Sequence, residues 1–595
     1  MAFPKSKFFS CYKSFTSVLN SLYSSTNGFE LKRGIETSIN SARLCHVLKQ
    51  PEPQVVDKKS TGNKENIRIK KGPGLDHFLS NFDLSLSKRE LKKISHPYVQ
   101  IENLDGQGRK VFFKVYGCQM NSSDVEVAWS ILKLHGYCLA TSMENADIIL
   151  IVTCAIREGA ETKIWRQLMQ LRSLKNKNKK NKENIKIGVL GCMAERIGSK
   201  IIEKENIVDV VAGPDSYRDL PRLLALANDG EKSINILLSH DETYANVNPV
   251  SLANNNTSAY VSIMRGCNNM CTYCIVPFTR GHERSRNIES ILDEVKYLSD
   301  QGIKEITLLG QNVNSYRDTS EVNHVSPTIP TNEEIYAKGF KAIYKNKTDG
   351  RRFADLLDKV SLIDPEMRIR FTSPHPKDFP DQVLHIIKER PNICNNLHLP
   401  AQCGSTRVLE LMQRGYTREA YIELVWHIRS IIPDVSLSSD FICGFCSETE
   451  EEFEETLTLM KKVQYNFCFV FPYSMREKTA AHRRLSDDIP AHVKAKRLNR
   501  MNAVFRQISL QLNLAKVGQR HLILVEGPSK RSSLQLVGRN DGNTKVIIPD
   551  LEIPVRSSSL NRNPLPGDYV EVIISDASSQ VLKATPLSIS SIKSF

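Results

Sequence analysis

Short apolar segments alternate with amphipathic segments of helical spacing along most of the chain from residue 108 onward. In the first part of this region the apolar segments predict four β-strands, at 110–117, 146–154, 186–192 and 208–213. A helix is expected after the first strand, over 122–136, with Ser and Asp side chains to cap its start and Gly136 to end it. Strands that alternate with helices predict an open α/β sheet, and the Lys- and Asn-rich run 174–186 is interpreted as a solvated insertion.

The alternation of strands and helices resumes between 259 and 485. Six strand-plus-helix units are predicted there, with strands at 260–267, 303–312, 367–376, 395–404, 435–445 and 467–476. Six such units predict an incomplete parallel barrel, in which functional residues lie at the carboxyl ends of the strands. The segment 318–351 lacks a clear period and is expected to be a loop insertion.

Beyond residue 518 the pattern changes to short alternating strands with Gly, Asp and Pro at the turns. This pattern predicts a small antiparallel β-barrel, a shape that often binds oligonucleotides. The fold class is therefore α/β with a C-terminal β-barrel. The expected domains are a presequence and linker at 1–107, an N-terminal sheet domain at 108–232, a partial (β/α)6 barrel at 253–512 and the small β-barrel at 515–586.

Charge and composition add two expectations to this pattern. The formal net charge is +15, and residues 1–72 hold 13 Lys and Arg against 5 Asp and Glu, so about half of the excess lies in the N-terminal segment. A moderately basic body suits an anionic partner such as nucleic acid. No apolar run reaches the roughly 18 residues of a membrane span, so we expect a soluble protein without one.

The first 28 residues, MAFPKSKFFSCYKSFTSVLNSLYSSTNG, carry Lys and many hydroxyl groups, and no acidic residue precedes Glu30. Apolar residues recur there at loosely helical spacing. These features favour a mitochondrial transit peptide and a location in the matrix, with a non-imported cytosolic or nuclear pool as an additional expectation. A disordered tail is the alternative, because the basic residues are Lys rather than Arg before Arg33.

Three of the 14 cysteines, Cys267, Cys271 and Cys274, lie directly after the first predicted barrel strand. A large chain with clustered cysteines and no secretory signal favours reduced thiols that bind metal. A structural zinc site needs four ligands, whereas three thiolates can hold three irons of a 4Fe–4S cube and leave the fourth iron open. Spacing and position favour such a cluster. A zinc site with a distant fourth ligand and three purely structural cysteines are the alternatives.

Three further cysteines, Cys118, Cys154 and Cys192, each end a strand of the predicted N-terminal sheet. The carboxyl ends of parallel strands meet at one edge of a sheet, so we expect these thiols to lie together although they are far apart in the sequence. A single buried cysteine is most often a packing residue. Three at equivalent strand ends, each beside Gly or Thr, predict a second iron–sulfur cluster.

The motif CxxxCxxC, with the aromatic Tyr273 before its last cysteine, resembles the radical S-adenosylmethionine (SAM) superfamily. The resemblance implies that the open iron binds SAM, which is then cleaved to a 5′-deoxyadenosyl radical. The superfamily places a short SAM-contacting motif after the second barrel strand. By this resemblance Tyr273, Gly310, Gln311 and Asn312 are cofactor-binding candidates, although an ordinary turn is the alternative for the last three.

Longer motifs narrow the resemblance to one family. The six cysteines, with GPDSYRDLP, HLPAQCGSTRVLELMQRGYTREAY, SDFICGF and FPYSMREKTAAH, are similar to the MiaB-type methylthiotransferases and their animal mitochondrial members, from about 110 to 585 and including a C-terminal TRAM domain. The resemblance implies addition of a methylthio group to carbon 2 of isopentenyl-adenosine at tRNA position 37. It also implies two 4Fe–4S clusters and SAM as cofactors. The implied partners are the tRNA anticodon stem-loop, an electron donor such as a ferredoxin or flavoprotein, and a kinase-activator protein.

Some positions depart from the family pattern. Cys446 and Ser447 replace the usual Pro-Gly, and Cys403 replaces a Ser. We interpret Cys403, Cys446 and four other thiols as packing residues rather than ligands; the four are Cys138, Cys394, Cys443 and Cys468.

Three other functions remain as alternatives. The first two keep the chemistry and act on threonylcarbamoyl-adenosine in tRNA or on an aspartate of a ribosomal protein. The polar end LSISSIKSF disfavours the threonylcarbamoyl type, whose eukaryotic members usually end in an apolar anchor. The third is a kinase-activator-binding regulator whose iron–sulfur clusters serve only for folding.

Two groups of basic residues are candidates for RNA contact. The predicted C-terminal barrel offers a face that either binds phosphate or is simply solvated: Arg520, Lys530, Arg531, Arg539 and Lys545. Arg280, Arg284 and Arg286 follow the cysteine trio of the barrel. They could meet RNA phosphate, the SAM carboxylate or carboxylates of the protein, and the sequence leaves these three options open.

Overall fold

The computed structural model describes most of the chain after residue 100. The described residues are 101–155, 158–180, 185–247, 249–250, 257–320, 340, 350–556 and 560–595. The chain divides into two compact units, 1–92 and 93–595, and every element below lies in the second. The predicted presequence therefore falls outside the described residues. Within the described part, no helix is long and apolar enough to cross a membrane.

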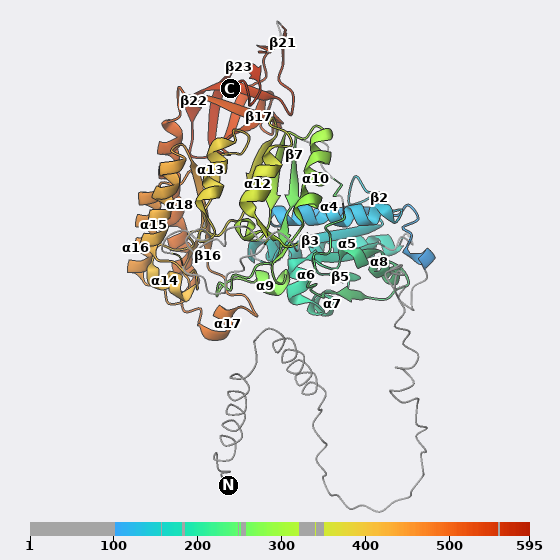
Figure 1. Ribbon diagram of the computed structural model, residues 1–595. Coiled ribbons are helices and arrows are strands. Elements are labelled where there is room, and N and C mark those ends of the chain that lie inside the picture. Colours follow the sequence, from blue (N-terminus) through green and yellow to red (C-terminus); the bar gives the residue numbers. More distant parts are fainter. Residues whose placement is uncertain are drawn as a thin grey trace, which may run out of the picture. The chain divides into compact units, whose positions relative to one another are not determined.

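The N-terminal domain is a six-stranded sheet in which every pairing is parallel, in the order β2-β1-β3-β4-β5-β6 (Figure 1). Its strands are β1 Lys110–Val115, β2 Cys138–Leu139, β3 Ile148–Thr153, β4 Lys186–Gly191, β5 Val210–Ala212 and β6 Ser233–Asn235. β3 and β4 are buried along their whole length, as continuous apolar runs in a parallel sheet require. The predicted open α/β sheet is confirmed.

Helices cover both faces of this sheet. Alternate residues of each strand point to opposite faces, and on each face they form a separate apolar core with the helices that lie there. One core includes α4 Gln119–Leu134 and α8 Leu220–Asn228, and the other includes α5 Glu158–Lys180, α6 Cys192–Ile197 and α7 Lys200–Lys204. α5 extends into the Lys- and Asn-rich run that was interpreted as an insertion. Lysine is a good helix former, and Lys175 is anchored there by a 2.6 Å ion pair with Asp209.

The start of α4 differs from the prediction. The helix begins at Gln119 with Cys118 as its N-cap residue, whereas the sequence pattern predicts capping by Ser and Asp side chains at 122–124. Asp124 is fully buried within the helix and binds Arg265 and Arg280 of the barrel domain. The capping signal was wrong because the partners of this carboxylate lie 141 and 156 residues away in the sequence.

Six parallel strands form the predicted incomplete barrel, as two three-stranded sheets, β13-β10-β7 and β14-β15-β16, joined by a parallel bridge from Ile369 to Ile393. The strands are β7 Ser258–Ser262, β10 Glu305–Leu309, β13 Arg368–Phe371, β14 Asn396–His398, β15 Ser436–Cys443 and β16 Phe467–Pro472. The longer helices of this domain are α10 Ile288–Asp300, α12 Phe353–Ser361, α13 Asp381–Glu389, α15 Arg418–Ile431, α16 Glu450–Val463 and α18 Ala491–Leu514. We call this domain the half barrel.

The predicted loop insertion begins and ends in a short antiparallel ribbon of β11 Arg317–Asp318 and β12 Arg351–Arg352. Between them only 319–320, Phe340 and Gly350 are described. The Phe340 ring packs against Tyr416, with ring centroids 4.9 Å apart, so at least this residue of the insertion joins the half-barrel core.

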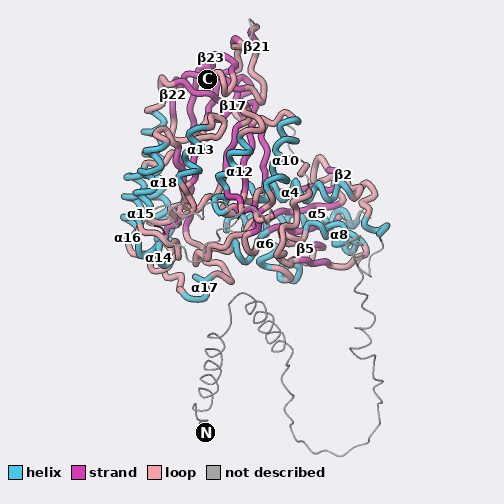
Figure 2. The backbone as a smooth tube through the Cα atoms, viewed as in Figure 1, coloured by secondary structure: helices cyan, strands magenta, loops and turns pink. Residues whose placement is uncertain are grey.

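The C-terminal domain is a closed barrel in the order β17-β18-β19-β23-β22. Figure 2 shows its strands in magenta at the top, with β17, β22 and β23 labelled. Its strands are β17 Arg520–Ser529, β18 Ser532–Asn540, β19 Lys545–Pro549, β22 Tyr569–Ala577 and β23 Val581–Ser590. The predicted small β-barrel is confirmed, and its pairings are antiparallel apart from β19 with β23.

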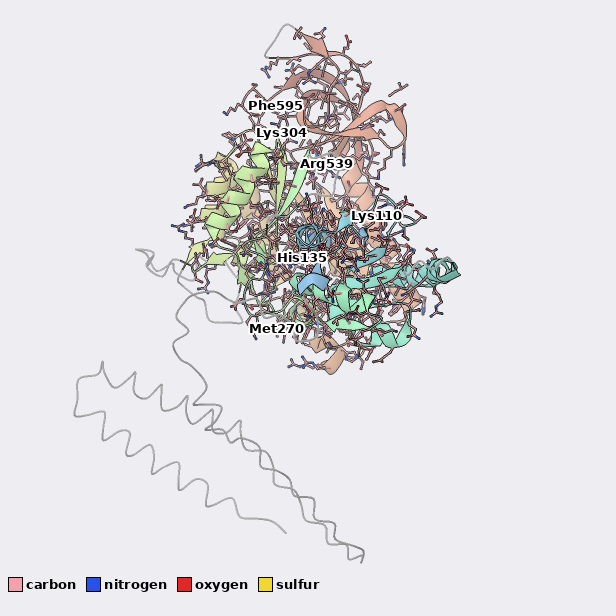
Figure 3. All side chains as sticks on the ribbon, turned by 90° about the vertical axis from the view of Figure 1, so that its right-hand side faces the viewer. Lys110, His135, Met270, Lys304, Arg539 and Phe595 are labelled. Atoms are coloured by element: carbon pink, nitrogen blue, oxygen red, sulfur yellow. The ribbon has the colours of Figure 1, made fainter. Side chains whose placement is uncertain are left out.

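The C-terminal barrel docks on the amino ends of the half-barrel strands. At the start of β13, Arg368 Nη2 donates to the Leu522 carbonyl at 2.7 Å and Arg370 Nη1 to the Asp541 carbonyl at 2.7 Å. Figure 3 shows Lys304 and Arg539 near this junction and Met270 toward the opposite end of the half barrel. The carboxyl ends of the strands are therefore left for the predicted cysteine site.

Candidate functional site

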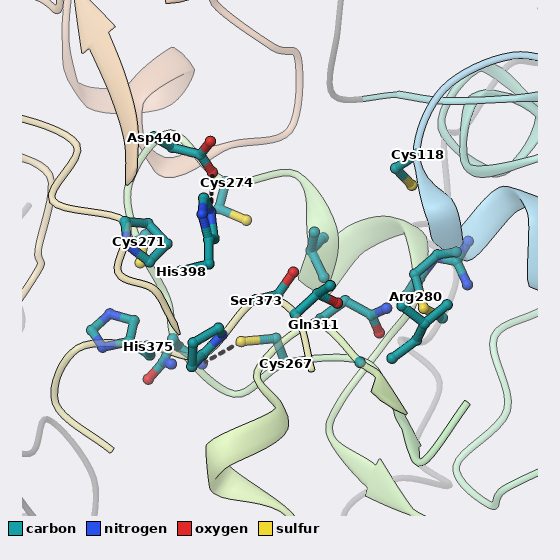
Figure 4. Close-up of a pocket in the computed structure, with 18 of the residues that line it drawn as sticks. Cys118, Cys267, Cys271, Cys274, Arg280, Gln311, Ser373, His375, His398 and Asp440 are labelled. Atoms are coloured by element: carbon teal, nitrogen blue, oxygen red, sulfur yellow. Dashed lines mark hydrogen bonds and ion pairs between the residues drawn. The ribbon is translucent and has the colours of Figure 1, made fainter. Parts of the chain in front are cut away.

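All six predicted cysteines line one cavity of about 290 Å³ (Figure 4). The N-terminal sheet contributes Cys118, Cys154 and Cys192, and the half barrel contributes Cys267, Cys271 and Cys274. The cavity volume is near the lower end of the range of small-molecule sites. Two domains that are separate in the sequence thus bring their thiols to a common space.

The half-barrel thiols lie on a loop that follows a two-residue strand, β8 Met264–Arg265. Gly266 has φ +76°, and a Cβ there would lie 2.0 Å from the His282 carbonyl oxygen, so only glycine fits. The Cys267 amide donates to the Gly281 carbonyl at 3.3 Å. The start of the cysteine loop is therefore held against the segment that follows the short helix α9 Val276–Thr279.

The N-terminal thiols lie at strand ends, as predicted. Cys118 follows β1, Cys154 follows β3, and Cys192 follows β4. Two glycines make the close approach of these strand ends feasible. A Cβ on Gly117 would lie 2.5 Å from the Cys154 Cβ, and one on Gly191 would lie 2.7 Å from the Thr153 carbonyl oxygen. The sheet edge is thus packed so closely that only glycine fits directly before Cys118 and Cys192.

Cys118 differs from three other thiols of the cavity in its electrostatic surroundings. A hydrogen bond with Cys154 and the charge of Arg280 lower the pKa of Cys118 to about 6, although burial opposes them. Burial raises the pKa of Cys274 to about 12 and that of Cys267 and Cys192 above the usual thiol value. In the metal-free protein at neutral pH, Cys118 is therefore the preformed thiolate among these four residues.

Three thiols from each domain line the cavity, and thiolates are the donors that hold an iron–sulfur cluster. Among the described residues, no three His, Cys, Asp or Glu side chains converge closely enough to hold one metal ion. A cube with three thiolates binds each of them through a different iron, so its ligands stand further apart. Each trio also receives a donor from an arginine: Arg280 Nε lies 3.1 Å from Cys192 Sγ, and Arg414 Nη1 lies 3.4 Å from Cys271 Sγ. Such donors are the usual surroundings of metal ligands.

Three of the four predicted SAM-contacting residues line the cavity, namely Tyr273, Gly310 and Gln311. Gln311 Oε1 accepts the Gly266 amide at 2.5 Å and so helps to hold the cysteine loop. Asn312 is buried and its amide is bonded inside the protein, to Asp378 Oδ2 at 2.8 Å and to the His375 amide at 3.0 Å. Direct contact of Asn312 with SAM thus has no support from this arrangement.

Other lining residues were not singled out from the sequence. His398 ends β14 and Asp440 lies within the adjacent strand β15, with His398 Nε2 3.3 Å from Asp440 Oδ2 (Figure 4). Ser373 and Gln402 have φ of +57° and +69°, and non-glycine residues held in this region cluster at ligand sites. The available signal was their position, because each lies within one of the predicted barrel-strand segments 367–376, 395–404 and 435–445.

Arg414 is a further functional candidate that sequence reasoning missed. Its side chain is buried and donates to Tyr416 Oη and the Pro400 carbonyl, both at 2.9 Å, as well as to Cys271. It lies in the quoted motif HLPAQCGSTRVLELMQRGYTREAY, but 143 residues separate it from Cys271. Nothing local in the sequence indicates that contact.

The three arginines after the cysteine loop bind carboxylates of the protein. Each is buried and forms an ion pair with a buried acid: Arg280 with Asp124, Arg284 with Asp215, and Arg286 with Glu294. The first two pairs cross from the half barrel to the N-terminal domain. Of the three options that the sequence left open, internal carboxylates are thus the partners in the structure.

The proposed phosphate-binding face of the C-terminal barrel is only partly available. Arg520 pairs with Glu571 at 2.9 Å and Arg539 with Glu526 at 2.7 Å. Lys530 and Arg531 are exposed where β17 turns into β18. These two cations are the best placed of the set to meet an RNA phosphate.

Three known families match successive parts of the chain. They are described as Uncharacterized protein family UPF0004 at residues 110–213, Radical SAM superfamily at 261–460 and TRAM domain at 514–587. Each match falls on one of the three domains. The half barrel and the C-terminal barrel thus match families with the names that the sequence motifs indicate.

Full-length relatives are more specific. The chain is 55% identical over 532 residues to the Mitochondrial tRNA methylthiotransferase CDK5RAP1 of Homo sapiens, covering 87% of this chain and 88% of that protein. It is 48% identical over 476 residues to the tRNA-2-methylthio-N(6)-dimethylallyladenosine synthase of Chloroherpeton thalassium, covering 80% and 96%. Among solved structures, the radical SAM methyltransferase TsrM of Kitasatospora setae aligns with a TM-score of 0.42 at 12% identity, covering 70% and 78%.

Proposed function

The chain belongs to the tRNA methylthiotransferase family, and from this premise we propose that it adds a methylthio group to carbon 2 of isopentenyl-adenosine at position 37 of mitochondrial tRNAs. The observation that carries the proposal is the single cavity lined by both cysteine trios. Carbon 2 of an adenine bears an unactivated C–H bond that ordinary acid–base side chains cannot break, so the reaction needs cofactors.

Two 4Fe–4S clusters and SAM are the cofactors that these residues would hold. Cys267, Cys271 and Cys274 would bind the cluster that activates SAM, and Cys118, Cys154 and Cys192 the auxiliary cluster. When bound, these groups supply an electron, a radical oxidant, sulfur and a methyl group. The two trios face the same cavity, which supports a division of these tasks between them.

The protein's own residues position the reactants. Arg414 donates to Cys271 Sγ and so fixes the orientation of that ligand, while Gln311 holds the Gly266 amide at the start of the cysteine loop. We assign the cavity wall at Tyr273, Gly310 and Ser373 to SAM. We assign His398 and Gln402, which line the same cavity, to the adenine of the substrate.

RNA would be held by the C-terminal barrel while the target base enters the cavity. A base next to the anticodon lies in a single-stranded loop, the kind of element that proteins read by stacking and backbone contacts. Lys530 and Arg531 supply exposed charge for the phosphates. Double replacement of these cations by Ala is expected to lower the salt dependence of RNA binding by about two phosphate contacts.

The cellular setting follows from the same proposal. The protein would act in the mitochondrial matrix and receive electrons from a ferredoxin or flavoprotein. A kinase-activator protein would be an additional partner rather than the main one, because a purely structural role does not call for two thiol trios on one cavity.

Mass spectrometry of mitochondrial tRNA from cells that lack the protein tests this proposal. We expect the 2-methylthio form of isopentenyl-adenosine to disappear and the unmodified isopentenyl form to accumulate. Re-expression of the normal chain should restore the product, whereas Cys271→Ala should not. An unchanged level of the methylthio product in the deficient cells would refute the proposed substrate.

A further inference from the structure

Arg280 belongs to the half barrel, but its guanidinium binds residues of the N-terminal domain. Nε donates to Cys192 Sγ at 3.1 Å, Nη1 to Asp124 Oδ1 at 3.3 Å, and Nη2 approaches Asn121 Oδ1 at 3.5 Å. The side chain is 4% exposed. Figure 4 shows Arg280 on the same side of the cavity as Cys118 and away from Cys271. This cation is therefore a half-barrel residue placed inside the auxiliary cysteine site.

Asp124 sets the direction in which Arg280 donates. Both terminal nitrogens of Arg280 bond to the two oxygens of this carboxylate. Because the guanidinium is planar and rigid, bidentate hydrogen bonding of its two terminal nitrogens to a carboxylate also fixes the direction of the Nε–H bond. That bond points at Cys192 Sγ. The Asp124 carboxylate is itself held by Arg265 Nη1 at 3.0 Å.

The segment that carries Arg280 also touches the other trio. The next residue, Gly281, accepts the amide of Cys267 through its carbonyl at 3.3 Å. On the other side of α9, Ile275 packs in one small apolar cluster with Cys192. One stretch of backbone, 275–281, thus contacts a cysteine of each trio. Any displacement of this stretch alters the relation between them.

We propose that Arg280 is a positioning residue for the auxiliary cluster. Its hydrogen bond to the Cys192 sulfur holds that cluster in a fixed position relative to the half barrel. The inference rests on the proposed function, because it needs a cluster on Cys118, Cys154 and Cys192. Donors to a ligand sulfur favour the more negatively charged, reduced state of a cluster. Arg280 therefore raises the reduction potential of the auxiliary cluster relative to a site without this donor.

Redox titration of the auxiliary cluster alone tests the role of Arg280. The parent protein is the full chain with Cys267, Cys271 and Cys274 replaced by Ala, reconstituted anaerobically with iron and sulfide. Arg280→Gln and Arg280→Lys are then compared with the parent by electron paramagnetic resonance at controlled potentials. We expect a shift to more negative potential for Arg280→Gln. A smaller shift in the same direction is expected for Arg280→Lys, which keeps the charge but loses the rigid fork.

Arg284→Gln is the matched control. Arg284 is equally buried, follows the same cysteine loop and forms a 3.0 Å ion pair with Asp215 across the same domain boundary. It also donates to the Arg280 carbonyl at 2.8 Å, so Arg284→Gln tests whether loss of support for the Arg280 main chain alone moves the potential. Its loss costs interface stability without removing a donor to a sulfur, so its potential should equal that of the parent. An unshifted Arg280→Gln, or an equal shift in Arg284→Gln, would overturn the inference.

If a variant no longer retains iron, its iron content is compared instead of its reduction potential. Loss of a partner of a metal ligand typically costs about 10- to 100-fold in metal affinity. Iron loss in Arg280→Gln with full iron in Arg284→Gln supports the positioning role, whereas equal loss in both variants contradicts it. A parent that binds no iron would refute the auxiliary cluster itself, and this inference with it.

Discussion

The two cysteine trios are built in different ways. Cys267, Cys271 and Cys274 belong to one short loop, which starts at a glycine turn and is held by contacts with Gly281, Gln311 and Arg414. Cys118, Cys154 and Cys192 come from three strand ends and meet only when a parallel sheet has formed around them. One short segment brings the cysteines of the first trio together, whereas only the folded N-terminal domain brings those of the second trio together.

This difference teaches where each site is vulnerable. A loop trio is damaged by changes to its own ligands or its own turn. A trio assembled from strand ends is also damaged by changes that move one strand against its neighbour, because register fixes which residues meet at the sheet edge. The predictions below separate the two trios, beginning with the largest expected effect.

Cys271→Ala is expected to abolish SAM cleavage, because it removes one of the three proposed ligands of the cluster that activates SAM. Iron content should fall from about eight to about four per chain, since one of two 4Fe–4S clusters is lost. The protein is reconstituted anaerobically with iron and sulfide. Its bound iron and the 5′-deoxyadenosine that it forms from SAM are then measured. Cys443→Ala, which removes a buried thiol outside the cavity lining, is the control and should keep both values. Intact cleavage in Cys271→Ala would contradict the radical role of the loop.

Cys154→Ala is expected to lose the methylthio product but to keep SAM cleavage. Its thiol belongs to the strand-end trio, so iron should again fall to about four per chain while 5′-deoxyadenosine is still formed. Product analysis on an anticodon stem-loop RNA with isopentenyl-adenosine checks this. If Cys154→Ala lost both activities together, the two trios would not be separable functions.

Gly117→Ala and Gly266→Ala should each impair one trio and spare the other. A Cβ at 117 would lie 2.5 Å from the Cys154 Cβ, and one at 266 would lie 2.0 Å from the His282 carbonyl oxygen. Gly108→Ala is the control for Gly266→Ala, because its φ of +74° matches the +76° of Gly266 and gives backbone strain of about 1–2 kcal/mol with no atom within 4 Å. Cluster-specific spectra after partial reconstitution should show selective loss in the first two variants. An equal effect of Gly108→Ala would mean that strain alone is responsible.

The metal-free protein should show the smallest difference, in thiol reactivity. The pKa of Cys118 is lowered to about 6 and that of Cys274 is raised to about 12. Because the thiolate is the reactive form, alkylation of Cys118 should be near its maximum at pH 7 and fall as the pH drops through about 6. Cys274 should stay slow until strongly alkaline pH. Peptide mass spectrometry after brief iodoacetamide treatment would reveal a common pH midpoint if this assignment is wrong.

The architecture could be predicted from the sequence because it is recorded in local periodicity. Buried parallel strands such as β3 and β4 are continuous apolar runs, and the turn glycines and strand-end cysteines mark their ends. The meeting of Cys118, Cys154 and Cys192 followed from that pattern and one rule of parallel sheets. For these features, local sequence and tertiary structure agree.

What could not be predicted depends on partners that are distant in the sequence. Asp124 has the residue type of a helix cap, yet two arginines of another domain determine its place. Asn312 sits in a motif that suggests ligand contact, but its amide is bonded to Asp378 and to the backbone of His375. Arg414 reaches Cys271 only because the folded half barrel brings these two distant residues together. The spacing of residues in the sequence does not predict any of these three contacts.

The docking of the C-terminal barrel has a consequence for evolution and engineering. Arg368 and Arg370 grip it through main-chain carbonyls of Leu522, Asn540 and Asp541, so the identities of those side chains do not enter these bonds. The outer surface of that barrel, where we propose the RNA contacts, can therefore change without breaking these bonds. A grafted barrel with the same backbone course should attach in the same orientation only if it also keeps Tyr569 and Asp541, because Tyr569 Oη donates to the Lys304 carbonyl at 2.9 Å and Asp541 Oδ2 accepts the Asn395 amide at 3.0 Å.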